Sequence, residues 1–261
     1  MNILDEIVRH KHRELQARQA ALPLPRLREL LRQSSEPPRD FACHLRRPGL
    51  GVIAEIKRRS PSRGELRPAL DPADLARRYE RAGAAAVSVL TDEHYFGGSD
   101  ADLRAARSAT ALPVLRKDFT IDEYQVYEAR HLGADAILLI VRILDDRRLA
   151  ALLELARELG LAALVETHCA DEVRRAVACG AAIIGVNARN LDNFEVSLSN
   201  ALRLRTLIPE GHLAVAESGI HTPADVRRVA EAGFDAILVG EALVTAADPG
   251  QKLRDLLGGR P

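Results

Sequence analysis

The sequence predicts a (β/α)8 barrel, in which eight parallel strands alternate with helices and close into a cylinder. Three observations support this fold class: eight short apolar runs, amphipathic stretches between them, and glycines that recur at similar intervals. Each strand and helix occupy about 25 residues, and eight such units fit a barrel whose typical length is roughly 250 residues. The runs are apolar throughout, as expected for strands that are covered on both faces.

Residues 1–50 precede the first strand and have mainly helical patterns. We expect one helix around Leu4–Gln19, a second around Pro25–Gln33, and a polar linker over residues 34–40. About 50 residues form only a marginal core by themselves. We therefore expect an N-terminal helical extension, packed on a barrel of residues 51–261, in a single domain overall. The sequence leaves open whether this extension covers the barrel as a lid.

The repeating unit is a helix, then a glycine, then a strand. Gly83, Gly133, Gly180 and Gly233 lie 50, 47 and 53 residues apart, each directly before an apolar run. Glycine suits this position because the residue after a helix often adopts the left-handed conformation. The eight expected strands lie within residues 52–57, 83–90, 114–116, 133–140, 162–165, 180–186, 213–216 and 233–240.

Amphipathic stretches separate these strands, and two of them have clear start signals. Asp71 and Thr222 each place a capping residue before a proline at the first helical position. A doubly wound open sheet is the alternative fold, but no glycine-rich phosphate-binding sequence follows the first strand. The expected helices include Pro72–Ala82, Ile121–Leu132, Asp145–Leu159 and Pro223–Ala232.

Composition argues against several functional classes. The 37 basic and 37 acidic residues give no net charge, which disfavours a general nucleic-acid or membrane surface. Tryptophan is absent and aromatic residues make up 3% of the chain, so base stacking is disfavoured. No run reaches the roughly 18 apolar residues of a membrane span, and the N-terminal segment lacks a signal peptide's apolar core. Three cysteines without metal spacing are typical of a reducing compartment, so we expect a cytoplasmic protein without a metal.

Lysine is scarce, and two of the four lysines end expected strands. The other 33 of the 37 basic residues are arginine. Arginine stays protonated and is a poor proton donor, whereas lysine can have its pKa lowered by burial and can pass a proton on. The strand-end positions of Lys57 and Lys117 therefore indicate chemistry rather than surface charge.

Polar residues gather where the strands end. In a barrel, the C-terminal ends of the strands meet at one mouth, where the active sites of this fold lie. Glu55 and Lys57 share one face of their strand because side chains alternate with a period of two. Burying so many charges without a function would be costly. The polar residues expected at this mouth are Glu55, Lys57, Lys117, Asp118, Glu166, Asn187, Arg189, Glu217 and Glu241.

Lysines and glutamates together suit proton transfers on a small anionic substrate. A glutamate near lysines stays ionised as a base, and a lysine beside another lysine becomes a better acid. The turns Ser218-Gly219 and Gly240-Glu241 have the small residues that a backbone phosphate site needs. The segment Ser60–Gly64 has the hydroxyls and the flexible turn of a loop that closes over a site.

Several polar residues have plainer interpretations. Asp118 is expected as a loop or cap residue, and Thr167 as the cap of the helix that follows it. His10 and His12 lie on a charged helix and are expected in solvent. His168 either supports the site or has no role in it. No cluster of histidine, cysteine and carboxylates has the spacing of a metal site.

Seven segments form a specific combination of motifs. They are residues 53–64 (IAEIKRRSPSRG), 88–99 (SVLTDEHYFGGS), 115–119 (LRKDF), 164–166 (LVE), 185–191 (GVNARNL), 216–220 (AESGI) and 239–243 (VGEAL). In this order and spacing they resemble the indole-3-glycerol phosphate synthase family, and the resemblance runs from the first helix to the last strand.

The resemblance implies an enzyme of tryptophan biosynthesis. It would close and decarboxylate 1-(2-carboxyphenylamino)-1-deoxyribulose 5-phosphate, giving indole-3-glycerol phosphate, carbon dioxide and water. The resemblance implies no cofactor and no metal. The expected partner is this small phosphorylated substrate, without nucleic acid or membrane, and the chain is expected to be a monomer or a weak homo-oligomer.

The resemblance also implies catalytic roles. Lys117 would be the general acid that protonates the substrate carbonyl as the ring closes. Glu166 would serve in the later proton removal and dehydration, and Lys57 would bind the substrate carboxylate and act as a further acid. The residues that would line the centre and orient these groups are Glu55, Glu217 and Asn187.

Substrate contacts follow from the same resemblance. Arg189 would face the anthranilate carboxylate. Glu241 would serve the phosphate through its backbone N–H, with its carboxylate turned away. The other residues of the phosphate-binding segments are Ser60, Ser218, Gly219 and Gly240. The apolar residues that would enclose the aromatic ring and complete the substrate site are Phe96, Phe119, Leu138, Leu191 and Leu238.

Three other functions remain open from the residues alone. A Schiff-base aldolase-type barrel would use Lys57 or Lys117 as a nucleophile. A catalytically silent barrel would bind a phosphorylated metabolite or a partner without turnover. A related isomerase would use a cysteine–aspartate pair for acid–base chemistry, and the sequence has no such pair in place.

Overall fold

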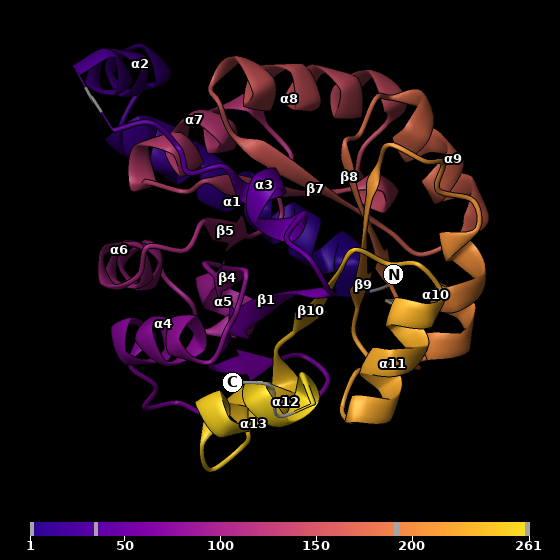
Figure 1. Cartoon of the computed structure of the whole chain (residues 1–261). Helices are drawn as coiled ribbons and strands as arrows, with labels where there is room; N and C mark the ends of the chain where they lie inside the picture. Colours follow the sequence, from indigo (N-terminus) through magenta and orange to yellow (C-terminus); the bar gives the residue numbers. More distant parts are fainter. Residues whose placement is uncertain (1–2, 34–35, 191–193, 259–261) are drawn as a thin grey trace.

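The computed structural model describes residues 3–33, 36–190 and 194–258, and a closed barrel of eight parallel strands forms its centre (Figure 1). The strands follow one another round the barrel in chain order, and the last pairs with the first. This confirms the (β/α)8 fold, and the open-sheet alternative is wrong. The strands are β1 (Gly51–Ile56), β4 (Ala86–Leu90), β5 (Val114–Lys117), β6 (Ala136–Ile140), β7 (Ala162–Thr167), β8 (Ile183–Asn187), β9 (Leu213–Glu217) and β10 (Ala236–Val239).

The helices surround the barrel and begin and end as the local sequence predicts. Gly83, Gly133, Gly180 and Gly233 all have positive φ, between 82° and 92°. The Asp71 and Thr222 side chains accept hydrogen bonds from the first-turn N–H groups of their helices. The outer helices are α4 (Pro72–Arg81), α6 (Asp100–Ala109), α7 (Glu123–Leu132), α8 (Asp146–Glu158), α9 (Ala170–Ala178), α10 (Leu198–Arg205), α11 (Pro223–Glu231) and α13 (Pro249–Leu256). Shorter pieces at strand ends are α5 (Glu93–Phe96), η1 (Val141–Ile143) and α12 (Glu241–Val244). None of the helices in the described ranges is long and apolar enough to cross a membrane.

The alternation of side chains divides the apolar core into two layers. Val52 and Ala54 of β1 belong to the layer between the strands and the helices, and Ile53 belongs to the layer inside the barrel. The inner layer fills the barrel with residues such as Leu115 and Leu164 up to the level at which the polar residues begin. The barrel is therefore a packed core with its hollow at one end.

The N-terminal extension forms three helices, α1 (Ile3–Ala21), α2 (Leu24–Gln33) and α3 (Phe41–Leu45). The first two confirm the sequence analysis, which had no element at α3 because five residues are too few for a helical period. Phe41 and Leu45 are each 1% exposed, and Leu45 lies beside Gly51 at the start of β1. Helix α3 therefore packs at the end of the barrel opposite the mouth, while α1, indigo in Figure 1, crosses the mouth itself.

A buried lysine fastens α1 to the mouth. Lys11 is 2% exposed, and its Nζ lies 2.7 Å from Glu14 Oε2, 3.0 Å from Asp92 Oδ2 and 2.9 Å from Asp118 Oδ1. Asp92 caps α5 by accepting from Tyr95 N–H, and Asp118 follows the last residue of β5. One ammonium group therefore joins the extension to two of the loops above the barrel.

Asp118 lies in the loop after β5, as expected, and it is in addition a buried ion-pair partner. Its Oδ2 accepts from Thr91 Oγ1 at 2.6 Å, and its Oδ1 accepts from Phe119 N–H at 2.8 Å. Burial opposes its charge, but Lys11 and Arg116 outweigh that effect and hold the pKa of Asp118 below its ordinary value. His10 differs from expectation, since its ring stacks on that of His94 at 4.4 Å, whereas His12 is exposed as expected.

Replacing Lys11 by alanine is expected to lower the free energy of unfolding by about 3–5 kcal/mol, because it leaves Asp92 buried without this cation and Asp118 with only the more distant Arg116. Urea unfolding of both proteins would measure this difference. The matched control is Arg26→Ala, which removes an ion pair of the same 2.7 Å length to Glu29 on exposed side chains. That change should cost no more than about 1 kcal/mol. Similar losses in the two variants would show that burial does not decide the contribution of Lys11.

Candidate functional site

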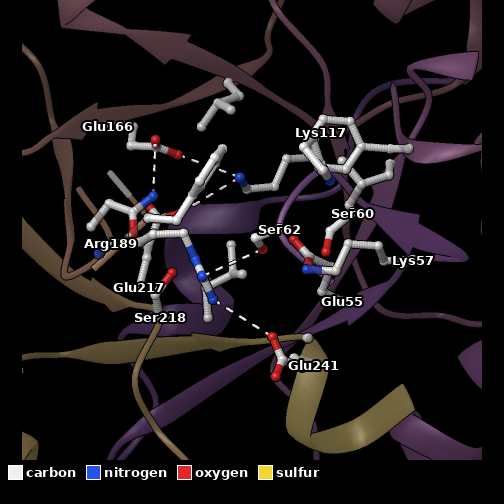
Figure 2. A pocket seen from close by; sticks show the side chains of 18 of the residues that line it. Glu55, Lys57, Ser60, Ser62, Lys117, Glu166, Arg189, Glu217, Ser218 and Glu241 are labelled. Carbon is white, nitrogen blue, oxygen red and sulfur yellow. Dashed lines mark hydrogen bonds and ion pairs between the residues drawn. The ribbon is translucent and has the colours of Figure 1, made fainter. Parts of the chain in front are cut away.

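The polar strand-end residues line one cavity at the mouth of the barrel, which Figure 2 shows from close by. The mouth expected from the sequence is therefore present, and the predicted residues in the described part of the chain all reach it. Leu191 lies outside the described residues. The seventeen predicted residues that line the cavity are Glu55, Lys57, Ser60, Phe96, Lys117, Asp118, Phe119, Leu138, Glu166, Asn187, Arg189, Glu217, Ser218, Gly219, Leu238, Gly240 and Glu241.

Lys117, at the end of β5, lies among carboxylates from strands β7, β9 and β1 across the barrel mouth. Its Nζ is 3.4 Å from Glu166 Oε2 and 3.9 Å from Glu217 Oε2, and Figure 2 shows Lys117 and Glu166 pointing toward one another. Burial opposes its charge, but Glu166, Glu217 and Glu55 outweigh burial and raise the pKa of Lys117 above its ordinary value. The expectation that a second lysine would make it a better acid is therefore wrong for the free protein. Lys57 instead pairs with Glu55, at 2.7 Å from its Oε1.

Glu166 and Glu217 are both buried, yet their acidities are driven in opposite directions. Burial opposes ionisation of Glu166, but Lys117, His168 and Asn187 outweigh it and hold the pKa of Glu166 below its ordinary value. Burial, with the charge of Glu166 next to it, raises the pKa of Glu217 well above its ordinary value. Neither Glu217 oxygen has a hydrogen-bond partner among the described residues, which suits a protonated acid better than a carboxylate. The pair can therefore supply one base and one acid.

Two glycines leave room for these carboxylates. A Cβ on Gly185 would lie 2.1 Å from Glu217 Oε1, and a Cβ on Gly240 would lie 2.2 Å from Glu55 Oε1. Gly185 is the middle residue of β8, between Glu166 on β7 and the strand that carries Glu217. A side chain at either glycine would displace a functional carboxylate.

Glu166 has contacts on its other oxygen as well. Asn187 Nδ2 donates to Oε1 at 3.1 Å, and His168 Nε2 lies 3.2 Å from the same atom. His168 N–H donates to Glu172 Oε2 at 2.7 Å, so this first-turn side chain of α9 holds the residue before the N-cap. The expectation that Thr167 would cap that helix is wrong, because its hydroxyl donates to the Gly185 carbonyl instead.

An apolar wall faces the charged groups. The Phe96 and Phe119 rings lie 6.0 Å apart at 38°, and Leu138 and Leu238 line the same cavity. Helix α1 completes the wall with Ile3, Leu4 and Ile7, which the sequence analysis did not assign to the site. This arrangement can hold a planar aromatic group beside the lysines.

The rim carries charges and hydroxyls. Arg189 Nη2 lies 3.6 Å from Glu241 Oε2, and Arg63 Nη2 lies 3.1 Å from Oε1 of the same carboxylate. Glu241 therefore turns its carboxylate toward the cavity-lining Arg189, as Figure 2 shows, and the expectation that it turns away is wrong. The buried Ser60 hydroxyl has no hydrogen-bond partner in the described ranges and is available to a ligand.

Two rim segments have distinctive backbone. Ser218 and Gly219 have φ of 66° and 75°, and a positive φ is strained at a serine. A Cβ on Gly219 would lie 2.8 Å from Val196 Cγ1, so the turn fits glycine there. The segment expected as a closing loop is a short hairpin, with β2 (Arg59–Ser60) paired to β3 (Gly64–Glu65).

Lys11 and His168 are the functional candidates that sequence reasoning missed or left open. Lys11 shares the signal that singled out Lys57 and Lys117, because it is a lysine in an arginine-rich chain. His168 lies two residues beyond Glu166, and on a strand that spacing places it on the same side. Among the described residues, no group of histidines, cysteines and carboxylates could hold a metal ion.

Comparison with known proteins assigns a family. A model of the indole-3-glycerol phosphate synthase family matches residues 4–256. Proteins of that name from Parafrankia sp. (strain EAN1pec) and Nocardioides sp. are each 52% identical to this chain, covering 98% and 99% of it, and 96% and 99% of their own lengths. Two solved structures share the barrel at low identity. One is a 3-hexulose-6-phosphate synthase with 17% identity and a TM-score of 0.65, covering 81% of this chain and 100% of that one. The other is a thiamine phosphate pyrophosphorylase from Pyrococcus furiosus with 19% identity and a TM-score of 0.61, covering 80% of this chain and 94% of that one.

Gly185→Ala is expected to lower the free energy of unfolding by about 1–3 kcal/mol, because its methyl group overlaps the Glu217 carboxylate. The cost should be much smaller in a Glu217→Ala background, where that carboxylate is gone. Urea unfolding of the four proteins of this double-mutant cycle would measure the coupling. An equal cost in both backgrounds would place the clash elsewhere, for example on Leu164, whose Cδ1 would lie 3.2 Å from the new methyl group.

The stability of the protein should fall between pH 6.5 and about pH 9 through His168. Burial opposes its charge, but Glu166 and Glu172 outweigh it and raise the pKa of His168 from 6.5 to about 9. This stabilisation is fully present below pH 6.5 and is lost as the pH rises through 9. The gap in unfolding free energy between wild type and His168→Gln should therefore be roughly 2–3 kcal/mol larger at pH 6 than at pH 9.5. Urea unfolding at both pH values tests this, and a gap independent of pH would contradict it.

Proposed function

The chain belongs to the indole-3-glycerol phosphate synthase family, whose members are carboxy-lyases of tryptophan biosynthesis, and on that premise we propose a role for each group at the barrel mouth. The substrate is 1-(2-carboxyphenylamino)-1-deoxyribulose 5-phosphate. The products are indole-3-glycerol phosphate, carbon dioxide and water. The observation that carries the assignment of roles is the contact of Lys117 with Glu166, one protonated and the other ionised, beside an aromatic wall.

Lys117 donates the proton of ring closure. Attack by the anthranilate ring carbon turns the substrate carbonyl oxygen into an alkoxide, which is a far stronger base than an amine. The raised pKa of Lys117 therefore keeps its amine protonated at neutral pH and still allows it to transfer the proton to the alkoxide. Departure of the carboxylate as carbon dioxide then returns its bonding electrons to the ring. Dehydration requires one proton for the departing hydroxyl and releases one from carbon.

Glu166 suits the proton transfers of the dehydration step. An ionised carboxylate can take the carbon-bound proton and then deliver it to the departing hydroxyl group, so Glu166 ends the cycle as it began. Glu217, held neutral, places no second negative charge beside Glu166. Over the whole reaction one proton is consumed, because the substrate carboxylate leaves as neutral carbon dioxide. That proton is the one that Lys117 supplies.

Different parts of the rim bind the two charged ends of the substrate, the anthranilate carboxylate and the phosphate. Lys57 and Arg189 are the cations available to the anthranilate carboxylate, and Phe96 and Phe119 flank its ring. The phosphate is assigned to Ser60 and to the backbone turns at Ser218-Gly219 and Gly240-Glu241. Holding both ends of one flexible molecule brings the ring carbon to the carbonyl, which can be worth up to about 7–11 kcal/mol of the barrier.

Two rival interpretations fit the site less well. A Schiff-base nucleophile must be a neutral amine, and the surrounding carboxylates keep Lys117 protonated. The isomerase alternative needs a cysteine at the mouth, and none of Cys43, Cys169 and Cys179 lines the cavity. We further propose that the enzyme acts in the cytoplasm on this small substrate, without metal or cofactor, as a monomer or weak homo-oligomer.

Lys117→Ala is expected to reduce turnover nearly to zero while substrate affinity stays within about tenfold, because the lost interaction acts only in the transition state. Indole fluorescence and absorbance follow the product directly, and the chain has no tryptophan to mask them. Addition of EDTA to wild type is the control and should leave the rate unchanged. Turnover close to wild type in the variant would remove Lys117 from the mechanism.

Lys57→Ala should instead raise KM clearly, by tenfold or more, because it removes a cation that binds the substrate carboxylate in the ground state. The same fluorescence assay over a range of substrate concentrations gives KM and kcat separately. Lys252→Ala, a change of lysine on α13, is the matched control and should leave both constants as they are. An unchanged KM in Lys57→Ala would contradict the binding role.

A further inference from the structure

We propose that His168 is a positioning residue that decides which of two buried carboxylates is the base, by keeping the ionised state on Glu166 rather than on Glu217. This inference rests on the proposed function, because the base is the one that the reaction uses. The two carboxylates share a single neighbouring ammonium group, that of Lys117, at 3.4 Å and 3.9 Å. A difference of half an ångström is too small to separate two acids strongly by itself.

His168 breaks that near-symmetry because it contacts one of the two carboxylates. Its Nε2 lies 3.2 Å from Glu166 Oε1, on the oxygen that does not face Lys117. Glu217 has no hydrogen-bond partner for either oxygen within the described ranges. Glu166 therefore lies between two cations, and Glu217 has only the more distant contact with Lys117.

The ring of His168 is held in place from behind. Its Nδ1 lies 3.1 Å from Glu172 Oε2, which also accepts from the His168 backbone N–H at 2.7 Å. Glu172 Oε1 in turn accepts from Arg142 Nε at 3.1 Å. The Nδ1 contact with Glu172 is a hydrogen bond, and the Nε2 contact with Glu166 is an ion-pair distance without a directed hydrogen bond. A carboxylate beside each ring nitrogen favours a proton on both, that is, the imidazolium form. The His168 side chain is 3% exposed, so water does not screen this charge.

The other groups that face the two carboxylates do not discriminate in this way. Asn187 donates to Glu166 but carries no charge. Glu55 affects the cluster as a further negative charge, and Lys57 is paired with it. Among the groups that the structure describes around the pair, His168 is thus the charge that favours ionisation of Glu166 in particular.

The test is a titration that does not depend on activity. In protein labelled with ¹³C at the glutamate side-chain carboxyl carbon, Glu166→Gln and Glu217→Gln identify the two signals, and each is followed against pH. In wild type, Glu166 should titrate well below Glu217. In His168→Gln, which keeps a side-chain donor but no charge, the Glu166 midpoint should rise and the Glu217 midpoint should fall, each by about one pH unit or more.

Kinetics give the second readout. In His168→Gln, the low-pH limb of the kcat profile should move to higher pH by about as much as the Glu166 midpoint moves, while kcat at pH 8 stays within about threefold of wild type. The lost charge matters only where Glu166 competes for a proton. Glu172→Gln should shift both readouts in the same direction by a smaller amount. His131→Gln, on α7 at the opposite end of the barrel, is the matched control and should change neither.

Three results would overturn the proposal. Unmoved carboxyl midpoints in His168→Gln would show that the histidine does not set the ionised state. A loss of kcat that is equal at all pH values would indicate packing alone. Movement of both midpoints in the same direction would show a general field effect instead of a choice between two acids. If wild type does not form indole at all, the proposed function fails, while the titration still decides the role of His168.

Discussion

One ammonium group, that of Lys117, balances carboxylates that would otherwise be too costly to bury at the barrel mouth. Three glutamates from different strands act on it, and their combined attraction outweighs the cost of removing it from water. Its charge lowers the pKa of Glu166, whereas burial and the charge of Glu166 raise the pKa of Glu217. The acid and the base of the site thus arise from the same charge distribution. Without Lys117, Glu166 would lose the cation that most favours its ionisation.

The places where lysine occurs in this chain fit the geometry of its ammonium group. Arginine presents a planar fork, and here it serves the outer pairs and the buried pair of Arg116 with Glu128. An ammonium is compact and can meet carboxylates from several directions at once. Lys11 meets three of them, and Lys117 lies among three more. Two of the four lysines thus lie where several carboxylates converge, while Lys57 pairs with Glu55 and Lys252 lies at an exposed contact.

The extension and the barrel depend on one another at the mouth. Helix α1 supplies apolar side chains to the cavity wall, and the barrel loops supply Asp92 and Asp118 to its lysine. Asp118 adjoins Lys117, and Asp92 caps the short helix that ends in Phe96. The ion pairs of the extension therefore act on the loops that carry the aromatic wall. The sequence left open whether the extension covers the barrel. In the structure, the ion pairs of Lys11 hold α1 over the mouth.

Much of the molecule could be predicted from the sequence, because the signals are local. Strand and helix periods, glycines after helices and capping residues each act within a few positions, and they determined the barrel and two of the three helices of the extension. Strand-end position alone brought Glu55, Lys117 and Glu217 to one mouth. The tertiary structure decided what these groups do to one another. Glu217 is neutral, Lys117 holds its proton, Glu241 turns toward Arg189, and His168 faces Glu166. The first three depend on distances between residues far apart along the chain, and only closure of the barrel sets those distances. The contact of His168 with Glu166 is local, and it depends on the course of the chain just after β7.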